Sequence, residues 1–418
     1  MKIAIKNARV VDPRSRLDAL RNLFLADGRI AAVTEVSVVP EGFADARQIN
    51  ASNLLVCPGL IDLCARLPDL ENELAAAAAG GITTLACPPD TTPPLDEARL
   101  VERLRHRSEQ SGLARMFPLG ALTQGLVGEK LTEMVKLANA GCIAFSQASA
   151  PLPDTLVLWR ALQYAATFGF SVWLRPKDAR LAFEGAAHDG AVAARLGLPG
   201  IPVSAETVAI ATVLQLARDT GARLHLTRIS SAEGIALIRR AREEGQAITC
   251  DVGIHHLHLD ESEIGYFDTN ARFDPPLRSA ADRAALSAAA AEGVLAICSD
   301  HTPVSDDGKH LPFAEALPGA VGLELLLPLV LRWAKQENIP LTTALARVTC
   351  DAAAILGLDA GHLSPGAAAD LCIFDPQASW QAGAQTLRTQ GKNTPFSGQT
   401  LRGRVQMTFI NGQLVFSR

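Results

Sequence analysis

The densest group of potential metal ligands in this 418-residue sequence lies between residues 251 and 260. His255 and His258 are spaced so that both imidazoles could chelate one metal ion, and Asp251 could supply a third ligand. His256 and Asp260 complete the group. The alternative is a loop whose histidines pack beneath their neighbours, and this is the interpretation that we favour.

Two other short segments carry reactive side chains. Cys64 could ligate zinc or act as a nucleophile, but a nucleophilic thiol needs a nearby base. Arg66 could lower the thiol pKa, whereas its guanidinium has no lone pair for a metal. Asp300 and His301 place a carboxylate beside an imidazole. We expect Cys64 to be a buried thiol and His301 to be a hydrogen-bonded structural histidine.

Composition excludes several classes of function. The net charge of −5 argues against a general nucleic-acid binder, which needs a concentrated basic surface. No apolar run approaches the roughly 18–20 residues of a membrane span, and the first residues do not resemble a signal peptide. The eight cysteines are scattered singly, mostly in apolar runs, which indicates buried thiols in a reducing compartment. We therefore expect a cytoplasmic protein, without nucleic-acid or membrane partners.

The chain between residues 56 and 358 alternates apolar strand patterns with helix patterns. This alternation is typical of an α/β protein with a (β/α)8 TIM-type barrel. Asp96, Ser204 and Ser231 stand where helix N-caps belong. Strands are predicted to start near residues 56, 82, 115, 142, 171, 223, 247 and 294, and helices to span 70–79, 96–110, 131–140, 155–168, 205–220, 232–244 and 281–292.

The two ends of the chain show β patterning instead. Residues 1–55 contain short alternating runs with tight turns, and residues 359–418 end in a hairpin signal around Asn411-Gly412. We expect one small composite β domain built from both termini. Between the barrel and the C-terminal strands, two further helices are predicted over residues 322–336 and 341–356.

Ordered motifs along nearly the whole chain resemble class I dihydroorotases of the amidohydrolase superfamily. A single motif would be weak evidence, but their order and spacing together support homology. The resemblance implies the amidohydrolase kind of barrel for residues 56–358. The motifs are Pro58-Gly59-Leu-Ile-Asp62, Gly80-Gly81-Ile-Thr-Thr, Asn270-Ala-Arg-Phe-Asp-Pro-Pro-Leu-Arg278, Ser299-Asp300-His301, Pro318-Gly319, Gly322-Leu-Glu324 and Asn393-Thr-Pro-Phe-Ser-Gly.

The same resemblance implies that the family's metal-ligand positions have changed. Dihydroorotases of this type carry two zinc-ligating histidines after the first barrel strand, one after the fifth and one after the sixth, with a bridging acidic stretch after the fourth. The corresponding residues here are Cys64, Arg66, Arg175, Arg228 and, in place of the acidic stretch, Gln147. The metal of a hydrolytic barrel of this type needs imidazole or carboxylate ligands, so we expect zinc to be absent and name no metal ligand or cofactor.

Substrate recognition is altered as well. Pro68 replaces the substrate-binding arginine of the family, and Asp90 and Thr92 replace two asparagines. Asn270 and Arg272 remain, either to bind an anion or to shape the loop before Pro275-Pro276.

One family carboxylate is retained. Asp300 is the carboxylate that acts as proton shuttle and metal contact in the family, and here it is vestigial. We expect it to form a salt-bridge cluster with Arg66, Arg175 and Arg228 at the barrel mouth.

This pattern predicts a non-catalytic chain. Some bacteria pair dihydroorotase-like chains that lack the zinc ligands with the aspartate carbamoyltransferase catalytic chain, and this sequence is similar to those chains. The resemblance implies a structural subunit for pyrimidine biosynthesis, a homodimer within a larger hetero-oligomer. Two alternatives stay open: an active cyclic amide hydrolase with an atypical or absent metal site, and a regulatory module whose arginine-lined mouth binds an anion.

Overall fold

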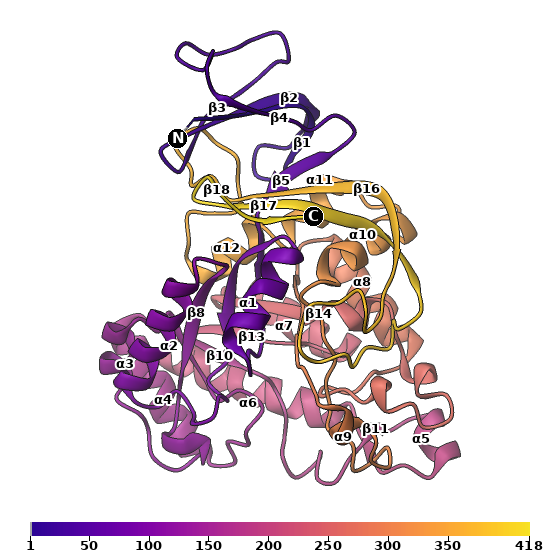
Figure 1. Cartoon of the computed structure of the whole chain (residues 1–418). Helices are drawn as coiled ribbons and strands as arrows, with labels where there is room; N and C mark the ends of the chain where they lie inside the picture. The colour runs from indigo at the N-terminus through magenta and orange to yellow at the C-terminus, as the bar shows by residue number, and fades with distance from the viewer. Residues whose placement is uncertain (1) are drawn as a thin grey trace.

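The computed structural model describes residues 2–418 as a barrel with a β sheet packed above it (Figure 1). Eight parallel strands form the barrel wall, which bears out the predicted fold. In wall order they are β6 (Leu60–Asp62), β7 (Ile82–Cys87), β8 (Arg115–Ala121), β9 (Ala144–Ser146), β10 (Ser171–Leu174), β13 (Arg223–Leu226), β14 (Ile248–Gly253) and β15 (Ala296–Cys298).

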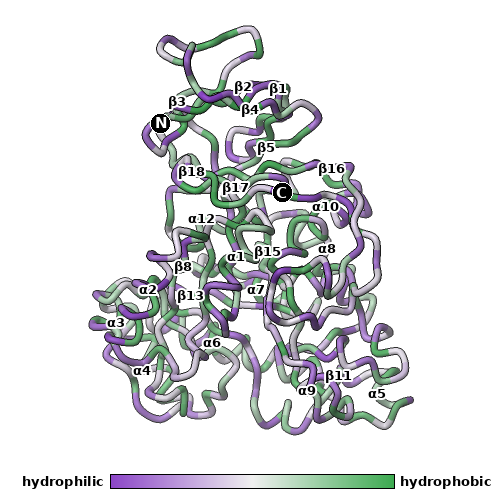
Figure 2. Tube along the Cα trace, in the orientation of Figure 1, coloured by the Kyte–Doolittle hydropathy of each residue, from purple (hydrophilic) through white to green (hydrophobic). Residues whose placement is uncertain are grey.

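Helices follow the barrel strands and cover them on the outside (Figure 1). Hydrophobic and hydrophilic residues alternate along these outer helices, as expected for helices with one buried face (Figure 2). The helices are α1 (Leu70–Ala79), α2 (Ala98–Ser111), α3 (Met134–Ala140), α4 (Thr155–Phe168), α6 (Ser204–Thr220), α7 (Ala232–Glu243) and α8 (Ala280–Ala291).

Only one of the three predicted N-caps is correct. Ser231 precedes α7, and its side chain accepts the Gly234 N–H. Asp96 instead accepts the Gly125 N–H (2.7 Å), and Glu97 precedes α2. Ser204 is already the first helical residue of α6, so it cannot cap that helix. Each wrong cap lies within two residues of the true helix start, where local sequence distinguishes neighbouring polar residues poorly.

The predicted helix over residues 341–356 is broken into α11 (Leu341–Ala346) and α12 (Cys350–Leu356). The break serves the barrel wall, because two carbonyl groups of the linking segment accept strand hydrogen bonds. The Ile297 N–H donates to the Arg347 carbonyl (3.2 Å), and the Ile61 N–H donates to the Val348 carbonyl (2.8 Å). This segment therefore supplies the backbone partners that β6 and β15 do not give each other.

The remaining elements lie in the connections around the barrel and before the C-terminal strands. They are η1 (Gln124–Leu126), β11 (Ala187–His188), α5 (Ala191–Leu196), β12 (Gly200–Ile201), η2 (Ile254–Leu257), η3 (Glu261–Ile264), η4 (Thr269–Ala271), α9 (Asp306–Lys309) and α10 (Leu326–Gln336). None of the helices described over residues 2–418 is both long and apolar enough to cross a membrane.

Both ends of the chain meet in the second large sheet, with the two termini on the same side of the barrel (Figure 1). Its strands are β1 (Ile3–Asp12), β2 (Leu17–Ala26), β3 (Arg29–Thr34), β4 (Arg47–Asn50), β5 (Leu55–Pro58), β16 (Leu371–Gln381), β17 (Thr400–Ile410) and β18 (Gln413–Ser417). The path runs β18-β17-β16-β5-β1-β2-β3, and β4 pairs with β1.

β5 corrects one sequence expectation. Val56 was predicted to start the first barrel strand, but β5 pairs with β16 and β1 in the second sheet. The barrel wall starts after Pro58, at β6, so a division between residues 55 and 56 cuts through β5. Local patterning could not show this, because β5 and β6 are both short and fully buried.

Candidate functional site at the barrel mouth

The barrel closes directly at the candidate site. Beyond the strand ends, Ala65 and His301 form a parallel bridge between the segments that follow β6 and β15. The His301 N–H donates to the Cys64 carbonyl (3.2 Å), and the Arg66 N–H donates to the His301 carbonyl (2.9 Å). Cys64, Arg66 and Asp300 are therefore held by main-chain hydrogen bonds at the carboxyl ends of adjacent strands, where barrel enzymes place their chemistry.

Asp300 lies between two arginines. Arg228 Nη1 donates to Asp300 Oδ1 (3.2 Å), and Arg66 Nη1 lies 3.8 Å from the same oxygen. The Arg228 and Asp300 side chains are only 5% and 6% exposed. Ser149 Oγ accepts from both guanidinium groups, at 3.0 Å from Arg228 and 3.4 Å from Arg66. Burial alone would lower the pKa of Arg228, but the nearby Asp300, Cys64 and Asp274 together raise it, so Arg228 keeps its positive charge.

Arg66 also extends toward the loop after β7. Its Nε donates to Asp90 Oδ2 (2.9 Å), and its Nη1 donates to Thr302 Oγ1 (3.1 Å). Burial acts most strongly and lowers the pKa of Arg66, but Asp90, Cys64 and Asp300 together outweigh it, so the pKa is raised. The acid that stands in place of a family asparagine therefore serves as a counter-ion.

Arg175 takes a different carboxylate from the one predicted. Its Nη2 donates to Asp274 Oδ1 (2.5 Å), and Lys177 Nζ lies 3.3 Å from Asp274 Oδ2. Burial acts to raise the pKa of Asp274, but Arg175, Lys177 and Arg228 together lower it to about 2. Arg228 Nη1 also donates to the Asp274 carbonyl (3.1 Å), which links the two ion-pair groups.

Three other sequence candidates lie outside these ion pairs. Gln147 exchanges hydrogen bonds with Thr123, and its Nε2 donates to the Leu126 carbonyl (3.0 Å). Arg272 donates to backbone carbonyls, including that of Ala186 (2.5 Å), so it shapes the surrounding loops. Asn270 lies in the η4 turn, where its N–H donates to Asp268 (2.9 Å).

The histidine-rich loop does not assemble a metal site. His255, His256 and His258 each donate through Nε2 to a different backbone carbonyl, at 3.2, 3.1 and 3.0 Å. Burial, the main cause, lowers the pKa of His255 to about 3 and that of His258 to about 4. Asp251 instead accepts from His225 Nε2 (2.8 Å), and Asp260 accepts the Ser262 N–H. Across residues 2–418, no three His, Cys, Asp or Glu side chains converge as a cation site.

His301 is a hydrogen-bonded structural residue. Its Nε2 donates to Glu73 Oε2 (3.0 Å), and its Nδ1 accepts the Gly322 N–H (3.0 Å). Glu73 also accepts from Thr389 Oγ1 (2.6 Å), so this glutamate of α1 connects His301 to the segment before β17. Both ring nitrogens are used in these contacts, which leaves no free nitrogen for catalysis.

Sequence reasoning did not assign roles to three residues of the site: Asp274, Lys177 and Ser149. Asp274 directly precedes Pro275-Pro276, in the motif in which only Asn270 and Arg272 were predicted to have a role. The excess of arginines over acids at the ligand positions was the available signal, because buried cations require counter-ions. The counter-ions of these arginines come from loops that are distant in sequence, so only the folded structure shows which acid pairs with which arginine.

The zinc that the fold family implies does not fit these residues. Guanidinium groups occupy the ends of β6, β10 and β13, and they carry no lone pair. Cys64 Sγ lies 3.9 Å from Asp300 Oδ1, but burial raises the pKa of this thiol well above its usual range. The remaining carboxylate is already paired with Arg228. The arrangement suits a set of internal ion pairs and not a hydrolytic metal centre.

Comparison with known proteins identifies related chains. A family described as dihydro-orotase-like matches residues 53–234, and the amidohydrolase family matches residues 175–415. A dihydroorotase-like protein of Pseudomonas putida is 43% identical over 99% of both chains, and one of Pseudomonas aeruginosa is 42% identical over the same shares. A protein of Geobacter sp. named dihydroorotase is 38% identical over 100% of this chain and 99% of its own.

Solved structures support the same fold. An L-hydantoinase from Arthrobacter aurescens superposes with a TM-score of 0.86 over 99% of this chain and 96% of its own, at 24% identity. A dihydropyrimidinase from Brevibacillus agri gives 0.83 over 100% and 95%, at 19% identity. Similarity at this level of identity concerns the fold alone.

Proposed function

This chain belongs to the dihydroorotase-like branch of the amidohydrolase family, and from that premise we propose that it is a catalytically inactive subunit of aspartate carbamoyltransferase. In this proposal it assembles with the catalytic chain of the transferase and supports its activity in de novo pyrimidine biosynthesis. The chain keeps a complete barrel while its mouth carries arginines. In this proposal, the surface that contacts the transferase is the exterior of the barrel or of the β sheet.

The observation that carries the proposal is the ion-pair network in place of a metal centre. Hydrolysis of a cyclic amide in this fold requires a cation to polarise the amide and lower the pKa of water. Arg66 and Arg228 hold Asp300, the carboxylate that would move the proton. Because these groups are buried and paired with each other, a divalent cation entering there would meet both desolvation and repulsion.

The competing candidate is an active cyclic amide hydrolase, and its support is the name dihydroorotase carried by relatives at 38% identity. A metal-free route would need Cys64 as a thiolate, but burial raises the pKa of this thiol. It would also need a general base, and the buried histidines of residues 255–258 donate to backbone carbonyls instead. The geometry therefore favours the non-catalytic role.

Co-purification tests the proposal directly. The transferase catalytic chain of the same organism would be produced with and without this protein, and its mass and carbamoyltransferase activity measured. We expect one larger complex whose activity depends on this chain. Separate elution with unchanged transferase activity would refute the scaffold role.

A mouth variant supplies the matched control. Asp300→Asn keeps an oxygen for Arg228 and tolerates the left-handed backbone at this position (φ +46°). Asparagine leaves Arg228 without its counter-charge and lowers the stability of the fold, but a scaffold that remains folded should still assemble, whereas an amidohydrolase should lose its hydrolytic activity. Stoichiometric zinc together with cyclisation of carbamoyl aspartate by the wild type, lost in Asp300→Asn, would establish the hydrolase.

A further inference from the structure

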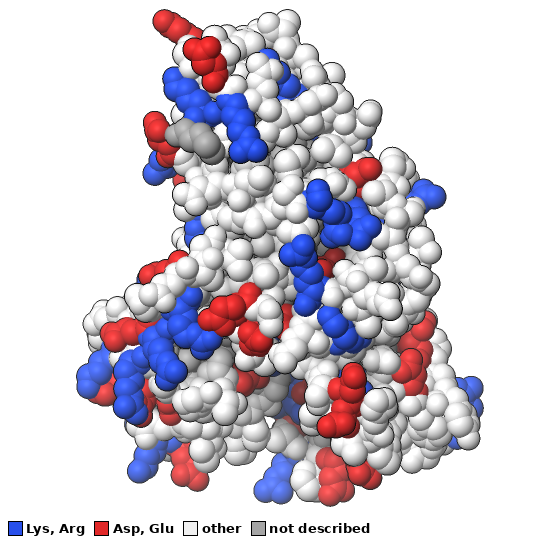
Figure 3. Space-filling model, in the orientation of Figure 1, with Lys and Arg blue, Asp and Glu red and all other residues white. Residues whose placement is uncertain are grey.

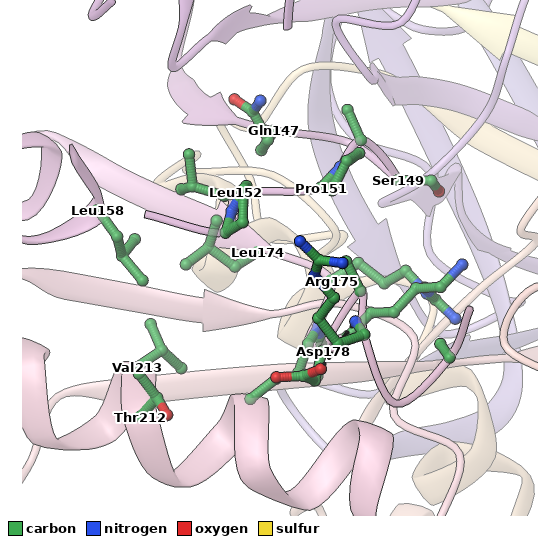
Figure 4. Close-up of a pocket in the computed structure, with 18 of the residues that line it drawn as sticks. Gln147, Ser149, Pro151, Leu152, Leu158, Leu174, Arg175, Asp178, Thr212 and Val213 are labelled. Atoms are coloured by element: carbon green, nitrogen blue, oxygen red, sulfur yellow. Dashed lines mark hydrogen bonds between the residues drawn. The ribbon is translucent and has the colours of Figure 1, made fainter. Parts of the chain in front are cut away.

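A cavity of about 450 Å³ lies beside the ion-pair network, between the loop after β9 and helix α6 (Figure 4). Leu152 from that loop, Leu158 from α4 and Val213 from α6 supply hydrophobic walls. Arg175 projects among them from the end of β10. Cavities of this size and character are typical of small-molecule sites, where a few polar groups orient an apolar ligand.

Arg175 has donors that the protein does not satisfy. Its side chain is 4% exposed, and its Nη2 is bound to Asp274. Its Nε and Nη1 are buried and have no hydrogen-bond partner among the described residues. A buried charged donor without an acceptor is costly, and such groups in native proteins require an explanation. An acceptor supplied by a ligand in the cavity would remove this cost.

The net charge around the cavity also favours a ligand with a negatively charged acceptor group. The ion-pair network holds four cations and three carboxylates, which leaves an excess of one positive charge. Asp178 and Arg180 also line the cavity, and their opposite charges leave this excess unchanged. The cations are Arg66, Arg175, Lys177 and Arg228, and the carboxylates are Asp90, Asp274 and Asp300.

We propose that this cavity binds a small monocarboxylate with a hydrophobic body, whose carboxylate accepts hydrogen bonds from Arg175 and whose body packs against Leu158 and Val213. A single negative charge matches the single excess cation, and the apolar walls suit an aliphatic or aromatic group. Phe183, which is 71% exposed, lies at the cavity and offers further apolar surface. The inference does not depend on assembly with the transferase.

The test uses hexanoate as the probe and hexanol as its uncharged counterpart, with the full-length protein. Binding is measured by calorimetry and by the rise in Tm that binding to the native state causes. Arg175→Met removes the carboxylate partner. Ala209→Phe fills the cavity from α6 and leaves Arg175 intact, while Ala211→Phe adds the same ring at an exposed position of the same helix as the matched control.

We expect saturable hexanoate binding to the wild type and to Ala211→Phe. Both Arg175→Met and Ala209→Phe should weaken it by at least about tenfold, which corresponds to about 1.4 kcal/mol. Hexanol should bind more weakly than hexanoate to the wild type. The proposal is overturned if hexanoate shows no saturable binding, if Ala209→Phe binds as well as Ala211→Phe, or if hexanol binds as tightly as hexanoate.

Discussion

At the scale of single residues, the barrel mouth is organised by buried ion pairs. Arg228 and Asp300 both adopt left-handed backbone conformations (φ +56° and +46°), which are uncommon outside glycine. Each side chain is nearly inaccessible, so each charge depends on its partner for stabilisation. Removal of one partner from such a pair is costly because an uncompensated charge stays buried.

Arg228→Met should lower the free energy of unfolding by about 3 kcal/mol, since Asp300 would retain only the more distant Arg66. The double variant Arg228→Met/Asp300→Asn should recover at least about 1 kcal/mol, because asparagine buries no charge and tolerates the left-handed backbone. Urea unfolding of both variants measures the difference. Equal destabilisation in the single and double variants would contradict a charge-pair role for Asp300.

Asp274 should make the stability of the protein sensitive to acid. Its pKa is lowered from an ordinary 3.8 to about 2, so its ionised form stabilises the fold above pH 4. This contribution is lost as pH falls from about 4 to about 2, and the shift corresponds to about 2 kcal/mol. The difference in unfolding free energy between wild type and Asp274→Asn should shrink over that window.

The exposed substitution Asp45→Asn is the control for this pH dependence. Its difference from wild type should stay small and nearly constant from pH 7 to pH 2. If Asp274→Asn behaves like Asp45→Asn, the cations around Asp274 do not hold its pKa low.

At the scale of elements, a local cap sets the start of α7, and hydrogen bonds to distant strands separate α11 from α12. Helix α7 begins where Ser231 accepts the Gly234 N–H, and the same hydroxyl donates to Glu206 of α6 (2.5 Å). Helices α11 and α12 are separate because the carbonyls between them complete the barrel wall. A helical propensity continuous over residues 341–356 yields to these tertiary hydrogen bonds.

Ser231→Ala should destabilise the protein by about 1–2 kcal/mol, because it removes an N-cap and leaves one oxygen of buried Glu206 without its donor. Ser204→Ala is the matched control: this serine is exposed and lies inside the first turn of α6. We expect it to change stability by less than about 0.5 kcal/mol. Thermal or urea unfolding that ranks the two variants equally would contradict the assignment of Ser231 as the cap.

At the scale of the whole molecule, the barrel and the composite sheet are joined by polar and packing contacts. Arg115 at the start of β8 forms an ion pair with Asp370, directly before β16. Thr408 of β17 donates to the Ala78 carbonyl of α1 (2.7 Å). On the face seen in Figure 3, acidic and basic side chains are interspersed between broad uncharged areas. This visible face offers no single-sign field for a nucleic acid.

We expect the barrel and the sheet to unfold in one cooperative transition. A variant that retains Trp173 as its only tryptophan reports on the barrel, and one that retains Trp380 reports on the sheet. Their fluorescence transitions in urea should coincide, because the joining contacts are buried or shared between the two parts. Separate midpoints would show that the sheet is an independent unit.

Much of this protein follows from its sequence alone. The alternation of apolar strands and helices predicts the barrel, since each buried strand and amphipathic helix has its own period, and α1 and α4 have the predicted bounds. The order of motifs identifies the family, and the arginines at the ends of β10 and β13 follow directly from their residue types. These features depend only on local sequence patterns and on the order of motifs along the chain, so they can be predicted without the folded structure.

Only the tertiary structure determined which segments of the chain pair with one another through strands, hydrogen bonds and ion pairs. It placed β5 in the composite sheet, split the helix over residues 341–356, and paired Arg175 with Asp274 rather than with Asp300. It also left two buried donors of Arg175 without a partner, in a residue that lines a largely hydrophobic cavity. Each of these outcomes depends on which distant segment supplies a hydrogen bond or a counter-charge. Residue types show that a buried arginine needs a counter-ion or an acceptor, but only the closure of the barrel determines which residue supplies it.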